Sequence, residues 1–167
     1  MRALTICQPY AHLIVTPAAE LPRGCFQKRV ENRVWTTDYR GSLLIHAGKS
    51  RAWLWPPNEA DFGDALVFGA LLGVVEVLDC IPIQRTDRSD PTEPGGISAE
   101  HATKYRWLRA HQHSEGPFGL VLGNVRRFRE PITFNGFQKL WFVPDHVVEN
   151  ATVHAERVSD PWEARAA

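Results

Sequence analysis

No apolar run in this chain is long enough to cross a membrane. The longest, residues 65–75, is interrupted by Gly69 and Gly73 and ends at Glu76, whereas a membrane-spanning helix needs ~20 consecutive apolar residues. The first apolar run, which starts at Ala3, breaks at Pro9 and lacks the longer core of a secretory signal. The short apolar segments must therefore be buried in a folded domain, which we expect to be cytoplasmic and to have no contact with a membrane.

Five or six segments have the apolar, β-branched composition of short buried strands. They are residues 3–6, 42–47, 71–78, 118–122, 125–128 and 140–143. Helices are expected at 9–14 and at 98–111, where Ser98 is a favourable capping residue. The helices do not alternate regularly with the strands, which argues against a doubly wound parallel sheet. The pattern predicts an α+β fold: a small, mostly antiparallel β-barrel with peripheral helices.

The formal net charge is zero, from 19 basic and 19 acidic residues, and this excludes a protein that coats any polyanion. The zero is a cancellation between segments. Residues 23–49 and 104–130 each carry six basic and two acidic side chains, whereas 50–103 and the tail from residue 145 are acidic. Two local basic stretches on an otherwise acidic chain are compatible with a focused nucleic-acid site.

The densest polar group surrounds Trp35. It consists of Lys28, Glu31, Arg33, Tyr39 and Arg40. In a regular strand Glu31 and Arg33 share one face and Lys28 lies on the other, so a bulge or turn is needed for the three to converge. One interpretation is a solvated edge strand whose charges pair across the sheet. The other is a site for a planar, hydrogen-bonding ligand beside a phosphate, such as a nucleobase.

A second basic stretch interleaves cations with aromatic residues, as a nucleic-acid groove requires. Its members are Lys104, Arg106, Arg109, Arg126, Arg127 and Arg129. They are candidates for contacts to the nucleic-acid backbone. The alternative is an ordinary helix surface next to a strand edge.

No metal or cofactor is expected. The cysteines, Cys7, Cys25 and Cys80, are too widely spaced for a zinc or redox motif. The histidines near the predicted helix, His101, His111 and His113, lack a metal-ligand spacing and are interpreted as surface residues. His46 is interpreted as a structural histidine held by a backbone hydrogen bond. Glu76 faces either solvent or the mouth of the barrel.

Five segments, taken in order, resemble the ASCH domain family of the PUA-like superfamily. They are residues 3–11, the pattern Gly24-x3-Lys28-x2-Glu31-x-Arg33, residues 39–47, residues 69–80 and residues 136–141. The resemblance covers about residues 2–144. We therefore expect an ASCH domain over 1–144, followed by a weakly patterned acidic extension over 145–167.

The resemblance implies a PUA-like β-barrel that binds RNA, or single-stranded or modified nucleic acid, in a cleft around the motif. The expected ligand-binding residues are Gln8, Pro9, Lys28, Glu31, Arg33, Trp35, Tyr39 and Arg40. No cofactor is implied.

Some small family members are amidohydrolases on acylated cytidine that use a lysine and, three residues later, a threonine nucleophile. Here Glu31 stands in the place of that threonine, and a carboxylate cannot act as the activated hydroxyl. Catalysis is left open. For a hydrolase of acylated nucleosides or RNA, the candidates are Lys28, Glu31 and Tyr39. A third hypothesis is a protein-interaction domain that regulates transcription or translation through the acidic tail and the loop 84–97.

Overall fold

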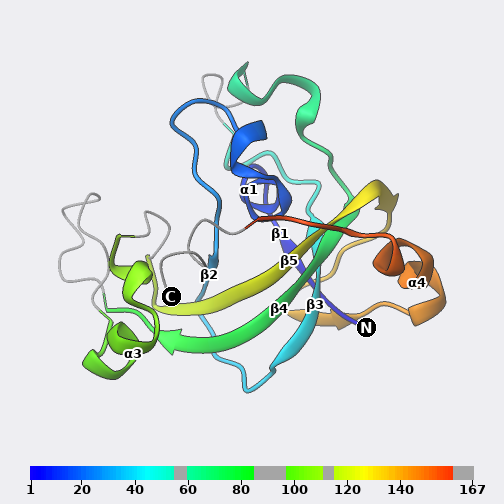
Figure 1. Cartoon of the computed structure of the whole chain (residues 1–167). Coiled ribbons are helices and arrows are strands. Elements are labelled where there is room, and N and C mark those ends of the chain that lie inside the picture. The colour runs from blue at the N-terminus through cyan, green and yellow to red at the C-terminus, as the bar shows by residue number, and fades with distance from the viewer. Residues whose placement is uncertain (55–59, 85–96, 111–114, 160–167) are drawn as a thin grey trace. The chain divides into compact units, whose positions relative to one another are not determined.

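The computed structural model describes residues 1–54, 60–84, 97–110 and 115–159, with the backbone alone at 109 and 110 (Figure 1). The chain forms two compact units. Unit 1 contains Met1–Gln27, Ser42–Glu76 and Asn124–Ser159, and unit 2 contains Lys28–Gly41 and the described residues of Val77–Gly123. Two long strands begin in one unit and end in the other.

Seven strands and six helical segments lie entirely within the described residues, and residues 60–62 are also helical. The strands are β1 (Arg2–Ile6), β2 (Val30–Arg33), β3 (Gly41–Ala47), β4 (Ala70–Pro82), β5 (Phe118–Thr133), β6 (Leu140–Phe142) and β7 (Glu156–Arg157). The α-helices are α1 (Tyr10–Val15), α3 (Ala99–Lys104) and α4 (Asp145–Val153). The 3-10 helices are η1 (Ala18–Glu20), η2 (Gly63–Ala65) and η3 (Arg106–Ala110). None of the described helices has the length and apolar character needed to span a bilayer.

In unit 1 the strands follow the order β5-β4-β3-β1-β6. β1 pairs in parallel with β3 and antiparallel with β6, and β7 adds to β5 in antiparallel fashion. The core of this unit consists of Ala3, Leu44, Leu71, Val74, Phe128, Trp141, Val143 and Val148. Gly73 has no room for a side chain, because a Cβ there would meet the backbone oxygen of Arg126.

In unit 2, β2 pairs antiparallel with the first part of β5, with Val30 opposite Val121 and Arg33 opposite Phe118. The core of this unit consists of Val30, Ile81, Ile83, Tyr105, Leu108 and Val121. The hydroxyl of Ser98 accepts a hydrogen bond from the backbone N–H of His101 at 3.3 Å and caps α3, as predicted.

The predicted fold class, an α+β PUA-like β-barrel with helices in the connections between strands, is confirmed. The pairing of β1 with β3 is a parallel element within it. The two strands expected at 118–122 and 125–128 are one continuous strand. Asn124 lies between them with φ +47°, a backbone conformation that asparagine tolerates better than most residues, and its side chain donates a hydrogen bond to Glu76.

Two other expectations differ from the structure. The helix predicted over 98–111 ends at Lys104 and continues as η3, because Tyr105 leaves helical geometry with its ring buried. The tail, which the sequence marks only as acidic, forms α4 and places Val148 in the core of unit 1. The boundary at residue 144 stays a prediction.

Candidate functional site

Lys28 and Arg33 converge on Glu31 within unit 2. The Lys28 Nζ lies 3.3 Å from Glu31 Oε2, and the Arg33 Nη2 lies 2.9 Å from Glu31 Oε1. Lys28 precedes the first residue of β2, so strand alternation does not dictate the direction of its side chain. Lys28, Glu31 and Arg33 therefore converge, because Lys28 lies outside the regular strand.

This Glu31 cluster, defined as Lys28, Glu31, Arg33 and Trp35, is largely buried. Lys28 is 3% exposed and Glu31 is 7% exposed. Beside them, the fully buried Arg29 donates from Nη1 to the backbone oxygen of Lys28 at 3.1 Å. Buried charges are tolerated only when they are paired and hydrogen-bonded. The carboxylate of Glu31 therefore holds both cations in fixed positions.

Trp35 gives the Glu31 cluster an aromatic member. The Cζ of Arg33 lies 6.0 Å from the centre of the Trp35 ring, and the tryptophan is half-buried. A guanidinium next to an indole can bind a phosphate while a planar group stacks on the ring. The arrangement thus offers the two kinds of contact that a nucleotide needs.

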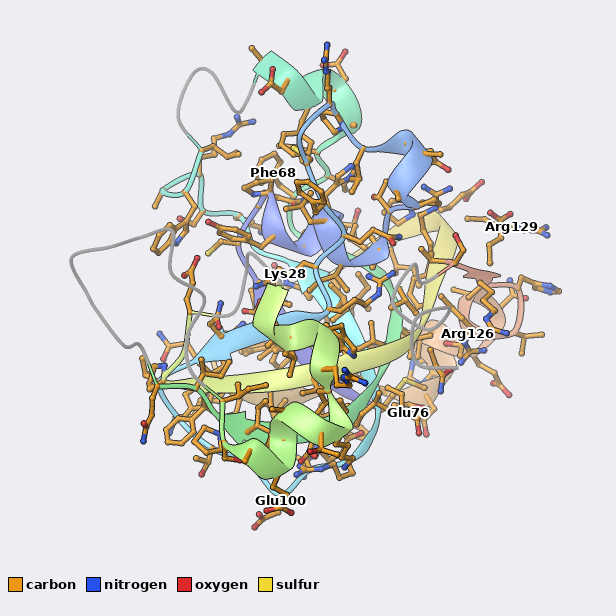
Figure 2. All side chains as sticks on the ribbon, turned by 60° about the vertical axis from the view of Figure 1, so that its left-hand side comes forward. Lys28, Phe68, Glu76, Glu100, Arg126 and Arg129 are labelled. Atoms are coloured by element: carbon orange, nitrogen blue, oxygen red, sulfur yellow. The ribbon has the colours of Figure 1, made fainter. Side chains whose placement is uncertain are left out.

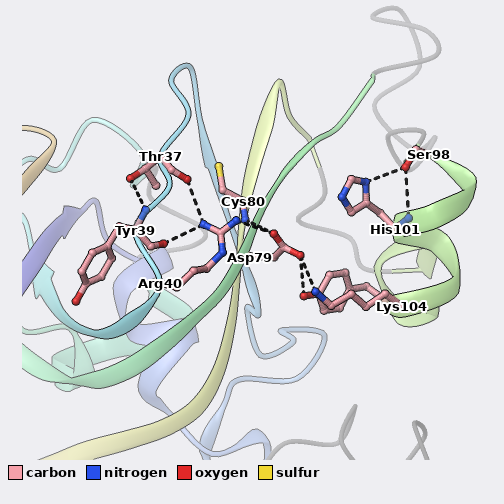
Figure 3. Close-up of polar contacts among 9 residues, drawn as sticks. Thr37, Tyr39, Arg40, Asp79, Cys80, Ser98, His101 and Lys104 are labelled. Carbon is pink, nitrogen blue, oxygen red and sulfur yellow. Dashed lines mark hydrogen bonds and ion pairs between the residues drawn. The ribbon is translucent and has the colours of Figure 1, made fainter.

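Arg40 belongs to a different group, the Asp79 cluster of Arg40, Asp79, Lys104 and Tyr105 (Figure 3). Asp79 accepts from Arg40 Nη2 at 2.8 Å, from Lys104 Nζ at 3.0 Å and from the Tyr105 hydroxyl at 3.0 Å. Partial burial raises the pKa of the Asp79 carboxyl, but hydrogen bonds from Lys104, Tyr105 and the backbone N–H of Cys80 outweigh it, and the pKa falls to about 2. This cluster joins α3 to β4 within unit 2.

The remaining contacts of Arg40 are local. Its Nη1 donates to the backbone oxygens of Thr37 and Tyr39, at 3.2 and 3.0 Å, and the N–H of Tyr39 donates to Thr37 Oγ1. The ring of Tyr39 points away from Asp79 (Figure 3). Arg40 therefore fastens the turn 37–40 to β4, and the ligand contacts expected of Tyr39 and Arg40 stay predictions.

Gln8 and Pro9 lie in unit 1, where β1 leads into α1. Gln8 is fully buried; its Nε2 donates to the backbone oxygen of Val67 at 2.7 Å, and its Oε1 accepts from the N–H of His12 at 3.0 Å. Pro9 is the residue that precedes α1. Gln8 thus holds the start of the helix in place. The expectation that Gln8 and Pro9 share a cleft with the Glu31 cluster stays a prediction.

The second basic stretch is divided between the two units. In unit 2, Lys104 binds Asp79, Arg106 is exposed on η3, and the side chain of Arg109 lies outside the described residues. The other three belong to unit 1. Arg126 donates to the backbone oxygen of Thr152, Arg127 pairs with Glu20, and Arg129 pairs with Glu156. Their role as contacts to a nucleic-acid backbone stays a prediction.

The histidine His46 is structural, as expected. Its Nε2 lies 2.9 Å from the backbone oxygen of Phe134, and burial lowers the pKa of the imidazole. In the part of the chain that the structure describes, no three His, Cys, Asp or Glu side chains gather as a metal site. His111, His113 and most of the loop 84–97 lie outside that part.

The sequence patterns did not identify Asp79 and Tyr105 as members of a polar cluster. Asp79 is a carboxylate that directly follows the apolar run 71–78. A charged residue at the end of such a run indicates that a charged partner lies nearby. The partner itself is not visible in the sequence, because Lys104 follows 25 residues later.

A family model, the ASCH domain, matches residues 4–115. The chain is also 24% identical over 160 residues to Activating signal cointegrator 1 from Homo sapiens, an alignment that covers 89% of this chain and 23% of the human protein. The chain thus spans less than a quarter of that relative. Because the family model covers more than half of its 167 residues, the chain belongs to the ASCH domain family.

Proposed function

We propose that this ASCH domain binds single-stranded nucleic acid, RNA or a strand with a modified base, through the Glu31 cluster. The observation that supports the proposal is the convergence of Lys28 and Arg33 on one carboxylate, with an indole ring beside the Arg33 guanidinium. Cations outnumber carboxylates three to one in residues 28–33, a balance that favours an anionic ligand.

Each member has a distinct role in this proposal. Arg33, which is more exposed than Lys28 or Glu31, contacts a phosphate, and Trp35 stacks on a base. Glu31 fixes the guanidinium of Arg33 and is the acceptor for an exocyclic amine. Lys28 is a positioning residue, because its amino group is buried against Glu31.

The test is a fluorescence titration at several salt concentrations. Its ligands are a labelled 12-nucleotide RNA, a DNA strand of the same sequence, and a duplex. We expect the single strands to bind more tightly than the duplex. Arg33→Gln removes one phosphate contact, so it should reduce the slope of log affinity against log salt by about 0.7. Trp35→Ala should weaken binding roughly tenfold through lost stacking.

Circular dichroism of both variants checks that they are folded, and Arg23→Gln, a change of the same kind at an exposed position, is the matched control. Folded variants that bind as tightly as the unsubstituted protein would show that the Glu31 cluster is not the binding site. The absence of binding to any of these strands at low salt would contradict the proposed nucleic-acid binding.

A second candidate function is an interaction domain that joins a regulatory protein complex. It is supported by the name of the human relative, Activating signal cointegrator 1. Nuclease treatment during affinity purification separates the two candidates, because a protein partner remains bound and a nucleic-acid-mediated one does not. Asp160→Asn with Glu163→Gln should release a partner held by the acidic tail, and retention after both changes would argue against the tail.

A further inference from the structure

Unit 1 contains a cavity of about 460 Å³ that involves no residue of the Glu31 cluster. It lies between α1, the segment before β4, the second part of β5, and β7. Its lining includes His12, Val15, Val67, Leu72, Arg127 and Arg129. This volume is in the range of small-molecule sites, which are typically ~300–1,000 Å³.

The cavity combines an apolar surface with two guanidinium groups. Val15 and Leu72 contribute buried apolar side chains, and Val67 contributes a half-buried one. Arg127 and Arg129 are two residues apart on β5 and therefore share one face of the strand, whereas Arg126 lies on the other. Figure 2 labels Arg126 and Arg129 at separate places on unit 1. Sites for organic ligands have this composition: a mainly apolar lining and a few placed polar groups.

Both guanidinium groups are paired with carboxylates that solvent can reach. Arg127 makes a two-pronged pair with Glu20, with Nη1–Oε2 at 2.5 Å and Nη2–Oε1 at 3.1 Å, and Arg129 Nε lies 3.3 Å from Glu156 Oε1. Ion pairs that solvent reaches contribute little to stability, because water solvates both partners when the pair is broken. Another carboxylate or a phosphate can therefore replace Glu20 on Arg127 at small cost.

His12 adds a neutral polar group to the wall. Burial, with the nearby charge of Arg127, lowers the pKa of its imidazole, and the ring packs edge-on against Phe62 at 5.5 Å between centroids. A neutral imidazole at pH 7 gives a hydrogen-bonding group without adding a third positive charge.

We propose that this cavity binds a small organic anion, an apolar ring or short chain that carries one carboxylate or phosphate, and that the anion takes the place of Glu20 on Arg127. The apolar part fills the space beside Val15, Val67 and Leu72. The site shares no residue with the Glu31 cluster, because every residue that lines it belongs to unit 1.

The test is a titration of the full chain with phenyl phosphate and with benzoate, in which two-dimensional NMR monitors the signals of the lining residues. Inorganic phosphate and benzyl alcohol serve as probes that contain only the acid or only the ring. Glu20→Gln and Arg127→Gln remove the same ion pair but should have opposite effects. Without its competitor, Arg127 should bind the better aryl anion about threefold more tightly, and without Arg127 that anion should bind at least tenfold more weakly.

Arg126→Gln, on the other face of β5, should leave the affinity unchanged and is the matched control. A preference for phenyl phosphate or for benzoate identifies the acid group. The proposal is overturned if neither aryl anion shifts the signals of the lining residues. It is also overturned if benzyl alcohol or inorganic phosphate binds equally well, or if the two variants change affinity in the same direction.

Discussion

Two carboxylates in unit 2, Glu31 and Asp79, each hold two cations, but their partners differ in exposure. The side chains of Lys28 and Arg33 are 3% and 20% exposed, whereas those of Arg40 and Lys104 are 41% and 61% exposed. Water can solvate the partners of Asp79 when the pair is broken, and it has little access to Lys28. The ion pairs at Glu31 are therefore essential to the stability of the fold, whereas those at Asp79 contribute only modestly to it.

The largest expected effect is at the buried carboxylate. Glu31→Gln leaves the ammonium of Lys28 buried without its carboxylate, and removing one partner of a buried pair typically costs about 3–5 kcal/mol. We expect the free energy of unfolding, measured in urea, to fall by that amount. Glu100→Gln, at an exposed position of α3, is the control and should change it by less than about 0.5 kcal/mol. A loss at Glu31 no larger than the control's would contradict the contrast between the clusters.

The corresponding change at the other cluster is smaller. Asp79→Asn removes the charge that attracts Arg40 and Lys104, but both cations remain in contact with water. Solvent screening limits the loss to about 1 kcal/mol. Urea unfolding under the same conditions measures it. A cost equal to that of Glu31→Gln would show that partner exposure does not separate the clusters.

The lowered pKa of Asp79 predicts how stability depends on pH. The folded carboxyl titrates at about 2 against an ordinary value of 3.8. Its stabilisation is therefore complete above about pH 5 and is lost as the pH falls toward 2, because the unfolded chain takes up the proton first. The difference in unfolding free energy between the unsubstituted protein and Asp79→Asn should shrink across this interval. A difference that stays constant from pH 5 to pH 2 would show that the carboxyl is not perturbed.

The smallest effect is expected at Lys104, the most exposed cation of the four. Lys104→Gln leaves Asp79 with Arg40 and Tyr105, so the urea midpoint should move only slightly at low salt. In 1 M salt, where the Debye length is about 3 Å, the remaining change should disappear. Lys28→Gln is the companion measurement, and its larger loss should persist in high salt.

Local sequence patterns predicted much of the fold. The apolar runs at 3–6 and 42–47 coincide with β1 and β3, and Ser98 caps α3 as expected. The patterns failed where a tertiary contact decides the local conformation. The predicted helix stops because Tyr105 turns its hydroxyl toward Asp79, and α4 forms where Val148 reaches the core.

The site was predictable in its residues but only partly in its geometry. The spacing of Lys28, Glu31 and Arg33 identified the group, and strand alternation alone would have separated Lys28 from the other two. What resolves this is the start of β2 at Val30, which leaves Lys28 outside the strand. Arg40 could not be separated from the group by sequence, since its partner Asp79 lies 39 residues away.

Nucleic-acid binding at the Glu31 cluster is tested most directly by comparing two arginines that each pair with a carboxylate in unit 2. Arg33→Gln and Arg40→Gln are the same substitution, and Arg40 is the more exposed of the two. In a titration with labelled single-stranded RNA, we expect at least a tenfold loss of affinity for Arg33→Gln and a clearly smaller loss for Arg40→Gln. Equal losses, or a larger loss at Arg40, would contradict the assignment of nucleic-acid binding to the Glu31 cluster.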